Sequence, residues 1–312
     1  MTEFRVLIAD GLEETGQSIL RAAAIVEDQA GMGPADLLDA VHGCDALIVG
    51  GRTKVSRQVF EAGSKLKVVG HTGADLAGID LDEAKKHGTV IVNAPLATTH
   101  AVAELAFGLL LAVARGIPRA DAAMKGEHAS GADFGGVELG GKTLGIIGYG
   151  PSGVEVGKWA SAFGMNAVAY DPFVAEQEVH AGGAETVSLQ DLFAWSDFIS
   201  LHLPFDVHSR DLIGPLALSQ MKDGVRLVCV SGRGMIDEEA LLSALASGKV
   251  AGAALDVFAA TPTASALARH PHVIATPQIG IHTVEARARA AEDIAREVLA
   301  ALKGEPLRWR VV

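Results

Sequence analysis

The stretch Thr143-Leu-Gly-Ile-Ile-Gly-Tyr-Gly-Pro-Ser-Gly-Val154 decides the fold of this chain. It opens with a short apolar run rich in β-branched residues, 143–147, and continues into the glycine turn Gly148-Tyr-Gly-Pro-Ser-Gly153. Residues 154–163 then have a composition compatible with a helix. This order predicts a strand, a tight turn and a helix, which together begin a βαβ unit.

The glycines of this turn have separate physical roles. Gly148 permits the tight turn, Gly150 lets the backbone approach a pyrophosphate, and Gly153 lets helix and strand pack closely. Dinucleotide phosphates would then lie at the positive N-terminus of the helix. Pro151 suits the first helical turn, where a missing N–H costs little, and Ser152 offers a hydroxyl in its place.

An acidic residue at the end of the next strand strengthens this interpretation. A second apolar run, 167–170, ends in Asp171, about 20 residues beyond the glycines, where a ribose-binding acid is expected. Because no Arg follows Asp171 closely, a 2′-phosphate would meet an unopposed negative charge. The sequence therefore predicts NAD in preference to NADP. The alternative is an ordinary βαβ turn followed by an exposed Asp, since glycine-rich turns alone are common.

Length and composition set the broad class of the protein. A chain of 312 residues is long enough for two domains, and its 49% hydrophobic and 21% charged content indicates a globular protein throughout. The net charge of −12 argues against nucleic acid or an anionic membrane as partner, because both require basic patches. It does not exclude an anionic substrate, since one local Arg can bind that. No metal site is predicted.

The cysteines and the apolar runs indicate where the protein works. Cys44 and Cys229 each lie in or beside an apolar run, as buried strand residues of a reducing compartment do. The N-terminus lacks a basic, apolar signal sequence, and the longest apolar run, 101–114, is too short to span a membrane and contains Glu104. We therefore expect a cytoplasmic protein.

Apolar, β-rich runs alternate with helix-compatible stretches in the first 95 residues. This alternation predicts parallel βαβ units and a sheet covered on both faces. The predicted strands are 4–9, 46–49, 66–69 and 89–92, and the predicted helices are 12–24, 34–41, 56–62 and 80–87.

A long apolar helix separates this region from the glycine turn. Pro95 closes the first domain, and Thr98 or Thr99 can cap a helix over 100–115. Because this helix is apolar on nearly every side, we expect more than one buried face, partly against a second subunit in a homodimer. The polar, glycine-containing stretch 124–141 is predicted to be a surface loop.

The same alternation resumes after the glycine turn and predicts a second doubly wound sheet. Further strands are predicted at 167–170, 197–203, 225–230, 250–255 and 272–275, and helices at 174–181, 189–195, 216–221 and 237–246. A final amphipathic helix is predicted over 284–302. Two α/β domains place a ligand at the carboxyl ends of their strands.

The order of these stretches resembles that of the D-isomer-specific 2-hydroxyacid dehydrogenases. The likeness covers nearly the whole chain, and it is carried by six segments besides the overall order. These are Lys67-Val-Val-Gly to Ile79-Asp80, Val102-Ala-Glu104, Gly148 to Asp171, Ser200-Leu-His-Leu-Pro204, Ser231-Gly-Arg-Gly-Met-Ile-Asp237, and Ala254-Leu-Asp-Val-Phe258 followed by Thr276-Pro277.

The resemblance implies an α/β fold of two doubly wound parallel-sheet domains. A smaller, flavodoxin-like substrate domain would consist of residues 1–97 and 284–312, and a Rossmann NAD-binding domain of residues 98–283. The expected activity is hydride transfer between nicotinamide and a small 2-hydroxy or 2-keto acid.

The resemblance also implies roles for individual residues. It assigns Arg233 to the substrate's carboxylate and reacting carbonyl, and a guanidinium can bind an α-keto acid bidentately and stabilise charge developing on its oxygen. It places Asp256 on the nicotinamide side and Leu203-Pro204 over the adenosine half. The alternatives are a solvated Arg in a turn, an Asp that caps a strand end and a Pro that ends a strand. The other implied cofactor contacts are His202, Val230, Ser231 and Gly280.

The family's substrate loop corresponds to residues 73–78 and departs from the family pattern. It implies Gly73, Ala74 and Asp75 as substrate-binding residues, together with Arg52. Asp75 stands where a glycine N–H is expected to bind carboxylate. Two adjacent carboxylates are unfavourable unless Asp75 points away or pairs with Arg52.

The family's catalytic pair is absent. Thr261 stands where members carry Glu, and Gln278 stands where they carry the His that donates and accepts the proton of the 2-hydroxyl. Gln278 can hydrogen-bond a carbonyl but has no proton that titrates near pH 7. General acid–base catalysis contributes about 10²- to 10⁴-fold, so a conventional dehydrogenase with this site should be slow.

Three hypotheses follow. In the first, the protein is an NAD-dependent oxidoreductase with a different proton donor, His71 by position, then His282 or His100, each of which could also be a surface or hinge histidine. In the second, the substrate needs no hydroxyl proton transfer, as in formate oxidation. In the third, the protein binds NAD(H) with little turnover and acts as a sensor whose domain closure a partner detects. The retained Arg233 counts against the third.

Overall fold

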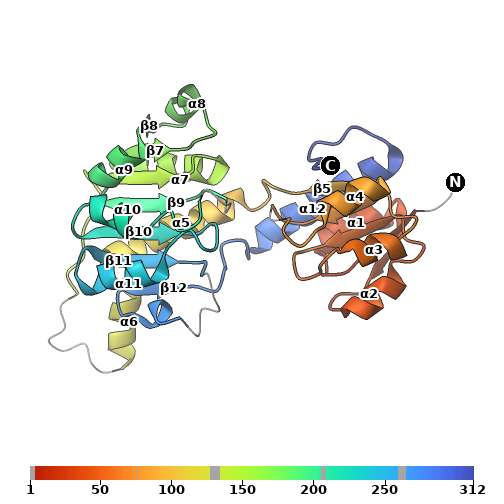
Figure 1. Cartoon of the computed structure of the whole chain (residues 1–312), viewed down its shortest axis with the longest axis horizontal. Coiled ribbons are helices and arrows are strands. Elements are labelled where there is room, and N and C mark those ends of the chain that lie inside the picture. Colours follow the sequence, from red (N-terminus) through yellow and green to blue (C-terminus); the bar gives the residue numbers. More distant parts are fainter. Residues whose placement is uncertain (1–3, 75, 127–133, 205–208, 259–264) are drawn as a thin grey trace. The chain divides into compact units, whose positions relative to one another are not determined.

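The computed structural model describes residues 4–74, 76–126, 134–204, 209–258 and 265–312. The chain forms two compact units (Figure 1). Unit 1 consists of Met1–Thr99 and His282–Val312, and unit 2 of His100–Ile281. Both are α/β, which confirms the predicted fold class.

Unit 1 is built on a five-stranded parallel sheet of order β2-β1-β3-β4-β5. Successive residues of a strand point to opposite faces, and β1 accordingly sends Leu7 into one apolar cluster and Val6 and Ile8 into another. The first cluster includes residues of α2, α3 and α4, and the second includes residues of α1 and α12. The strands are β1 (Phe4–Ile8), β2 (Ala24–Asp28), β3 (Ala46–Val49), β4 (Val68–His71) and β5 (Val90–Asn93), and the helices are α1 (Glu14–Arg21), α2 (Pro34–Ala40), α3 (Arg57–Ala62), α4 (Leu81–His87) and α12 (Val284–Lys303).

Unit 2 is built on a seven-stranded parallel sheet of order β12-β11-β10-β9-β6-β7-β8. The order reverses between β6 and β9, and ligands of doubly wound sheets bind where the order reverses, beyond the carboxyl ends of the strands. The strands are β6 (Thr143–Ile147), β7 (Asn166–Tyr170), β8 (Glu185–Thr186), β9 (Phe198–Leu201), β10 (Val225–Cys229), β11 (Val250–Leu255) and β12 (Val273–Ala275).

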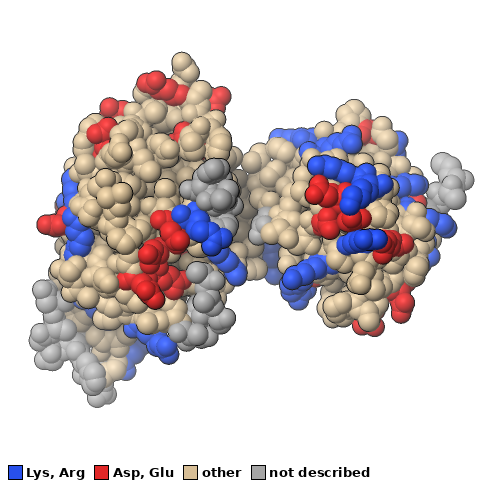
Figure 2. All heavy atoms as spheres, in the orientation of Figure 1, with Lys and Arg blue, Asp and Glu red and all other residues tan. Residues whose placement is uncertain are grey.

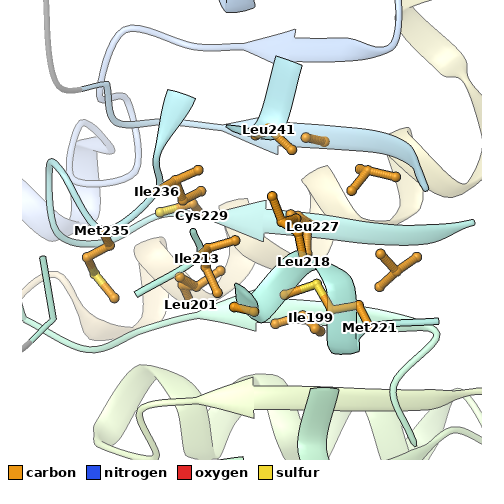
Figure 3. Close-up of a cluster of buried hydrophobic side chains, with 14 of the residues drawn as sticks. Ile199, Leu201, Ile213, Leu218, Met221, Leu227, Cys229, Met235, Ile236 and Leu241 are labelled. Carbon is orange, nitrogen blue, oxygen red and sulfur yellow. The ribbon is translucent and has the colours of Figure 1, made fainter. Parts of the chain in front are cut away.

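Helices cover both faces of this second sheet. Ile199, Leu201 and Leu227 pack with residues of α10 and α11 in the cluster of Figure 3, whereas Phe198 packs on the opposite face with residues of α5 and α7. The helices of unit 2 are α5 (Thr99–Arg115, which begins in unit 1), α6 (Ile117–Lys125), α7 (Pro151–Ala162), α8 (Glu176–Ala181), α9 (Leu189–Trp195), α10 (Pro215–Gln220), α11 (Glu238–Ala246) and the 3₁₀ turn η2 (Leu267–Arg269).

The structure departs from the local predictions at two points. The helix predicted over 12–24 ends at Arg21, and the β-branched residues that follow form the edge strand β2. Residues 117–125 form α6, which was not predicted; Gly116, at φ +60°, turns the chain out of α5 before it. Helix α7 begins at Pro151, which confirms the predicted place of this proline in the first helical turn. The predicted loop over 124–141 lies partly outside the described residues.

Both cysteines are buried and free, as predicted. No single described helix is long and apolar enough to cross a membrane, and α5 and α6 pass that test only when they are taken together across a 64° bend. On the face of each unit that Figure 2 shows, acidic and basic side chains are interspersed.

Candidate active site

The glycine turn follows β6 at the carboxyl edge of the sheet in unit 2. Gly148 has a φ of +94°, and a Cβ there would lie 2.5 Å from the backbone nitrogen of Leu203. A Cβ on Gly153 would lie 2.3 Å from the carbonyl oxygen of Gly148. The protein's own packing therefore requires glycine at both positions.

Gly150 differs from the other two glycines. Its φ of −70° suits any residue, and a Cβ there would meet no atom of the described residues within 4 Å. The fold therefore does not require glycine at this position. The open space beside Gly150 fits the close approach of a pyrophosphate to the backbone.

The first turn of α7 presents free donors beside this space. The first intrahelical hydrogen bond runs from Val154 N to Gly150 O, over 3.0 Å. The N–H groups of Ser152 and Gly153 precede this bond, and among the described residues they have no hydrogen-bond partner. Such groups and the helix dipole favour an anion.

Asp171 follows β7, and two backbone groups hold its carboxylate. One oxygen accepts from Tyr149 N over 2.7 Å, and the other accepts from Phe173 N over 2.8 Å. Each carboxylate oxygen has a second lone pair, so Asp171 can still accept the hydroxyls of a ribose.

His202 lies at the end of β9, beside the glycine turn, and is only 9% exposed. Its Nδ1 is 3.2 Å from Ser152 Oγ, and its Nε2 is 2.8 Å from Ser200 Oγ. Burial lowers the pKa of His202 to about 4. The ring is therefore neutral at physiological pH.

This pKa predicts an acid-sensitive stability. An unfolded His202 takes up a proton near pH 6.5, whereas the folded one does so only near pH 4. The contribution of neutral His202 to the free energy of unfolding is therefore fully present above about pH 6.5. It is lost as the pH falls toward 4, by about 3 kcal/mol in total. We expect denaturant titrations to show wild type losing more stability over this window than His202→Gln. If the stability of the two proteins fell equally with pH, the low pKa of folded His202 would be contradicted.

The loop after β10 carries Arg233. Ser231 Oγ anchors the loop by donating to Leu201 O over 2.9 Å, and Gly232 and Gly234, with φ of +54° and +82°, flank the arginine. Arg233 is exposed, and its Nη2 donates to Oε1 of Gln278. Two predicted catalytic residues, 45 positions apart in sequence, are thus brought together.

Asp256, at the end of β11, organises the loop that carries Gln278. This carboxylate is 2% exposed and accepts from Thr276 Oγ1 over 2.6 Å, Ile279 N over 2.8 Å and Gly280 N over 2.9 Å. The carbonyl of Asp256 accepts from the Gln278 N–H over 2.9 Å. Gln278 is held at a φ of +58°, a strained backbone conformation for a residue other than glycine.

In unit 1 the candidate His71 is the last residue of β4 and is 5% exposed. Its Nδ1 lies 3.0 Å from both the N–H and the carbonyl oxygen of Gly73. Among the described residues Nε2 has no hydrogen-bond partner, and it is not one of the fully buried unpaired atoms. The ring therefore presents Nε2 outward from a fixed Nδ1.

Arg52 pairs with Asp10, a residue that the sequence analysis missed. Arg52 Nη2 donates to Asp10 O over 2.8 Å, while the Asp10 carboxylate accepts from Gly50 N over 2.7 Å and from Thr53 Oγ1 over 2.7 Å. Burial raises the pKa of Asp10, but the hydrogen bonds from Thr53 and Gly50 and the charge of Arg52 more than offset this, so the pKa lies below its usual value. The position of Asp10 two residues beyond the end of β1 was the available signal.

The other sequence candidates are distributed as follows. Val230 and Leu203 are buried beside the glycine turn and the Arg233 loop, and Pro204 is exposed. His282 is exposed in unit 1. His100 lies 3.2 Å from Glu104 on the surface of α5. Ala74 is exposed, whereas Asp75 and Thr261 lie outside the described residues, as does any pairing of Asp75 with Arg52.

A glycine turn at the reversal of a parallel sheet, a strand-end Asp and an Arg on the same sheet edge define a dinucleotide-linked α/β protein with a second α/β unit. Residues 107–280 match the family model of the D-isomer specific 2-hydroxyacid dehydrogenase NAD binding domain. The chain therefore belongs to the D-isomer-specific 2-hydroxyacid dehydrogenase family. This match also confirms NAD, the cofactor predicted from the sequence.

Individual relatives agree with this membership. The chain is 41% identical to D-3-phosphoglycerate dehydrogenase 2, chloroplastic, of Arabidopsis thaliana, over 96% of this chain and 49% of that protein. Among solved structures, TT0316 protein from Thermus thermophilus is 31% identical with a TM-score of 0.89, covering 99% of this chain and 100% of that one. A glyoxylate reductase from Paecilomyes thermophila is 29% identical with a TM-score of 0.89, covering 100% and 99%. The chain spans about half the length of the curated relatives that it matches, 49% and 56% for the first two.

Proposed function

We propose that this protein is an NAD-dependent oxidoreductase that transfers hydride between nicotinamide and C2 of a small 2-hydroxy or 2-keto acid. Unit 2 (100–281) is the NAD-binding domain in this proposal, and unit 1 (1–99 and 282–312) is the substrate domain. The observation that carries the proposal is the Arg233–Gln278 pair on the carboxyl edge of the NAD-binding sheet. When bound there, NAD supplies the hydride acceptor or donor.

Within this proposal Arg233 binds the substrate's carboxylate and carbonyl oxygen. A guanidinium has five N–H donors, and the contact with Gln278 uses one of them. The remaining donors match an α-keto acid, which presents two acceptor oxygens on the same side. The positive charge also stabilises the negative charge that develops on the carbonyl oxygen as hydride arrives at the carbon.

Gln278 acts as a neutral hydrogen-bond donor. Only its oxygen can face Arg233, because the guanidinium has no acceptor, so its amide NH₂ is the group left for a substrate. Asp256 fixes the loop on either side of it. This amide can polarise a carbonyl but cannot transfer a proton to it.

The proton donor in this proposal is His71. For Nε2 to exchange a proton, Nδ1 keeps its own proton in both states of the ring and donates it to the Gly73 carbonyl over 3.0 Å. Nε2 is then a donor in the charged ring and an acceptor in the neutral ring. This nitrogen is free to exchange a proton with the 2-hydroxyl group.

A second candidate function rests on the same Gln278. Because Gln278 has no proton to exchange near neutral pH, this function is NAD(H) binding by unit 2 without efficient turnover. In that case the protein would act as an NAD(H) sensor. The favoured and the second function differ in turnover but share NADH binding.

A homodimer is part of the proposal. Residues of α5 and α7 line an apolar hollow on unit 2, with Phe107, Trp159 and Phe163 at its wall, and Phe163 is 49% exposed. Apolar surface of this kind is typical of contacts between subunits.

The test is NADH oxidation against a panel of 2-keto acids that includes glyoxylate, hydroxypyruvate and phenylpyruvate, with NADH affinity titrated in parallel. We expect turnover with at least one acid and loss of this turnover in Arg233→Ala. NADH binding without turnover on any acid would favour the sensor. Absence of NADH binding would overturn both functions.

A further inference from the structure

The buried histidine of unit 2 suggests how the first turn of α7 is prepared for phosphate. Pro151 removes one backbone donor from this turn, and the hydroxyl of Ser152 is the side-chain group that can replace it. However, Ser152 Oγ also lies 3.2 Å from Nδ1 of His202. If the hydroxyl proton points at His202, it is not available to a ligand.

Ser200 decides which way this hydrogen bond runs. Its hydroxyl is 1% exposed, and among the described residues its one hydrogen-bond partner is His202 Nε2, at 2.8 Å. A buried hydroxyl proton without an acceptor is costly, so Ser200 must donate to Nε2. Nε2 is then an acceptor, and the proton of the neutral ring resides on Nδ1.

The remaining hydrogen bond follows from that tautomer. The Nδ1–H group donates to Ser152 Oγ, so the Ser152 oxygen is the acceptor in its hydrogen bond with His202. Its own O–H is left to donate elsewhere. The neutral state of the ring, which burial maintains, is required for this arrangement, because a doubly protonated ring would leave the Ser200 proton without an acceptor.

We propose that His202 is a positioning residue that fixes the Ser152 hydroxyl as a hydrogen-bond donor to the diphosphate of the bound dinucleotide, through the chain Ser200 O–H to Nε2 and Nδ1–H to Ser152 Oγ. The inference rests on the proposed function only in requiring that unit 2 binds NAD. Neither His202 nor Ser200 touches the ligand in this scheme. Ser152 is the residue in contact.

The first experiment measures the affinity of the full chain for ADP-ribose, which carries the diphosphate but no nicotinamide. A hydrogen bond to a charged group predicts that Ser152→Ala weakens binding about tenfold or more. His202→Gln, which lacks a donor at the Nδ1 position, should weaken binding similarly, whereas His202→Asn, whose amide nitrogen can occupy that position, should retain most of it. The double variant Ser152→Ala/His202→Gln should bind no more weakly than Ser152→Ala.

Thermal unfolding of each variant serves as the folding control. Adenosine, which has no phosphate, should bind all folded variants alike. If His202→Gln folds and binds ADP-ribose as wild type does, or if the two substitutions weaken binding additively, the inference is overturned. If wild type itself does not bind ADP-ribose or NADH, the proposed function fails instead, and the two failures are thus distinguishable.

A spectroscopic measurement tests the tautomer directly. The protein is labelled with ¹⁵N-histidine, and the signals of His202 among its 11 histidines are assigned by their loss in His202→Asn. These signals should show a protonated Nδ1 and an unprotonated Nε2 at neutral pH. Ser200→Ala should abolish this preference. A His202 protonated on Nε2 in wild type would refute the chain of donors.

Discussion

Replacing Arg233 with Ala is expected to reduce kcat/KM by about 10²- to 10³-fold while NADH affinity stays within about twofold of wild type. The guanidinium provides both the substrate's carboxylate contact and the positive charge near the reacting oxygen in the proposed site. It lies exposed on a loop with glycines on both sides, so its removal leaves no buried partner unpaired. Steady-state kinetics with the best keto acid and fluorescence titration of NADH measure the two effects separately.

Arg233→Lys is the matched control. It keeps the positive charge but loses the planar fork that can contact Gln278 and substrate together. We therefore expect activity between those of wild type and Arg233→Ala, with most of the loss in KM. Unchanged kcat/KM in Arg233→Ala would show that the substrate binds elsewhere.

The second large effect is expected in the glycine turn, where the same Gly→Ala substitution should reduce stability at one position and NADH affinity at another. Gly148→Ala should destabilise the protein by about 3 kcal/mol or more, because the new methyl group meets the Leu203 backbone at 2.5 Å and the residue must hold a φ of +94°. Gly150→Ala should change the free energy of unfolding by only about 1 kcal/mol or less. It should nevertheless weaken NADH binding at least tenfold, because the methyl group enters the space left for the pyrophosphate.

Denaturant unfolding and NADH titration together distinguish these outcomes. The comparison needs no separate control, since both variants add one methyl group to the same turn. A Gly150→Ala protein that binds NADH as wild type does would show that no phosphate approaches that backbone. A fully stable Gly148→Ala protein would contradict the close contact with Leu203.

Local sequence patterns predicted much of unit 2. The strands β6 and β11 have the predicted limits, because each is a continuous apolar run ended by a glycine or an Asp. The roles of Gly148 and Gly153 could be predicted because each depends on neighbours within a few residues or on the strand beside them. Strand β2 could not be separated from α1, since the apolar residues of both form one unbroken pattern and only pairing with β1 distinguishes them.

The hydrogen-bond partners of the polar site residues could not be predicted from the sequence. Ser200, His202 and Ser152 meet only because β9 lies next to β6 in the sheet, and that neighbour relation crosses 50 residues. Likewise, Asp256 hydrogen-bonds a loop more than 20 residues further on. The strained φ of Gln278 depends on that loop and has no local sequence signal.

The most direct test of the proposed activity is deuteride transfer. The purified protein is incubated with NADH carrying deuterium at C4 on the transferred face and with the most active 2-keto acid, and the product is analysed by mass spectrometry. The account predicts one deuterium at C2 of the resulting 2-hydroxy acid, and its loss in Arg233→Ala. Tight NADH binding with no deuterium in any acid product, for either face of the nicotinamide, would contradict the dehydrogenase assignment.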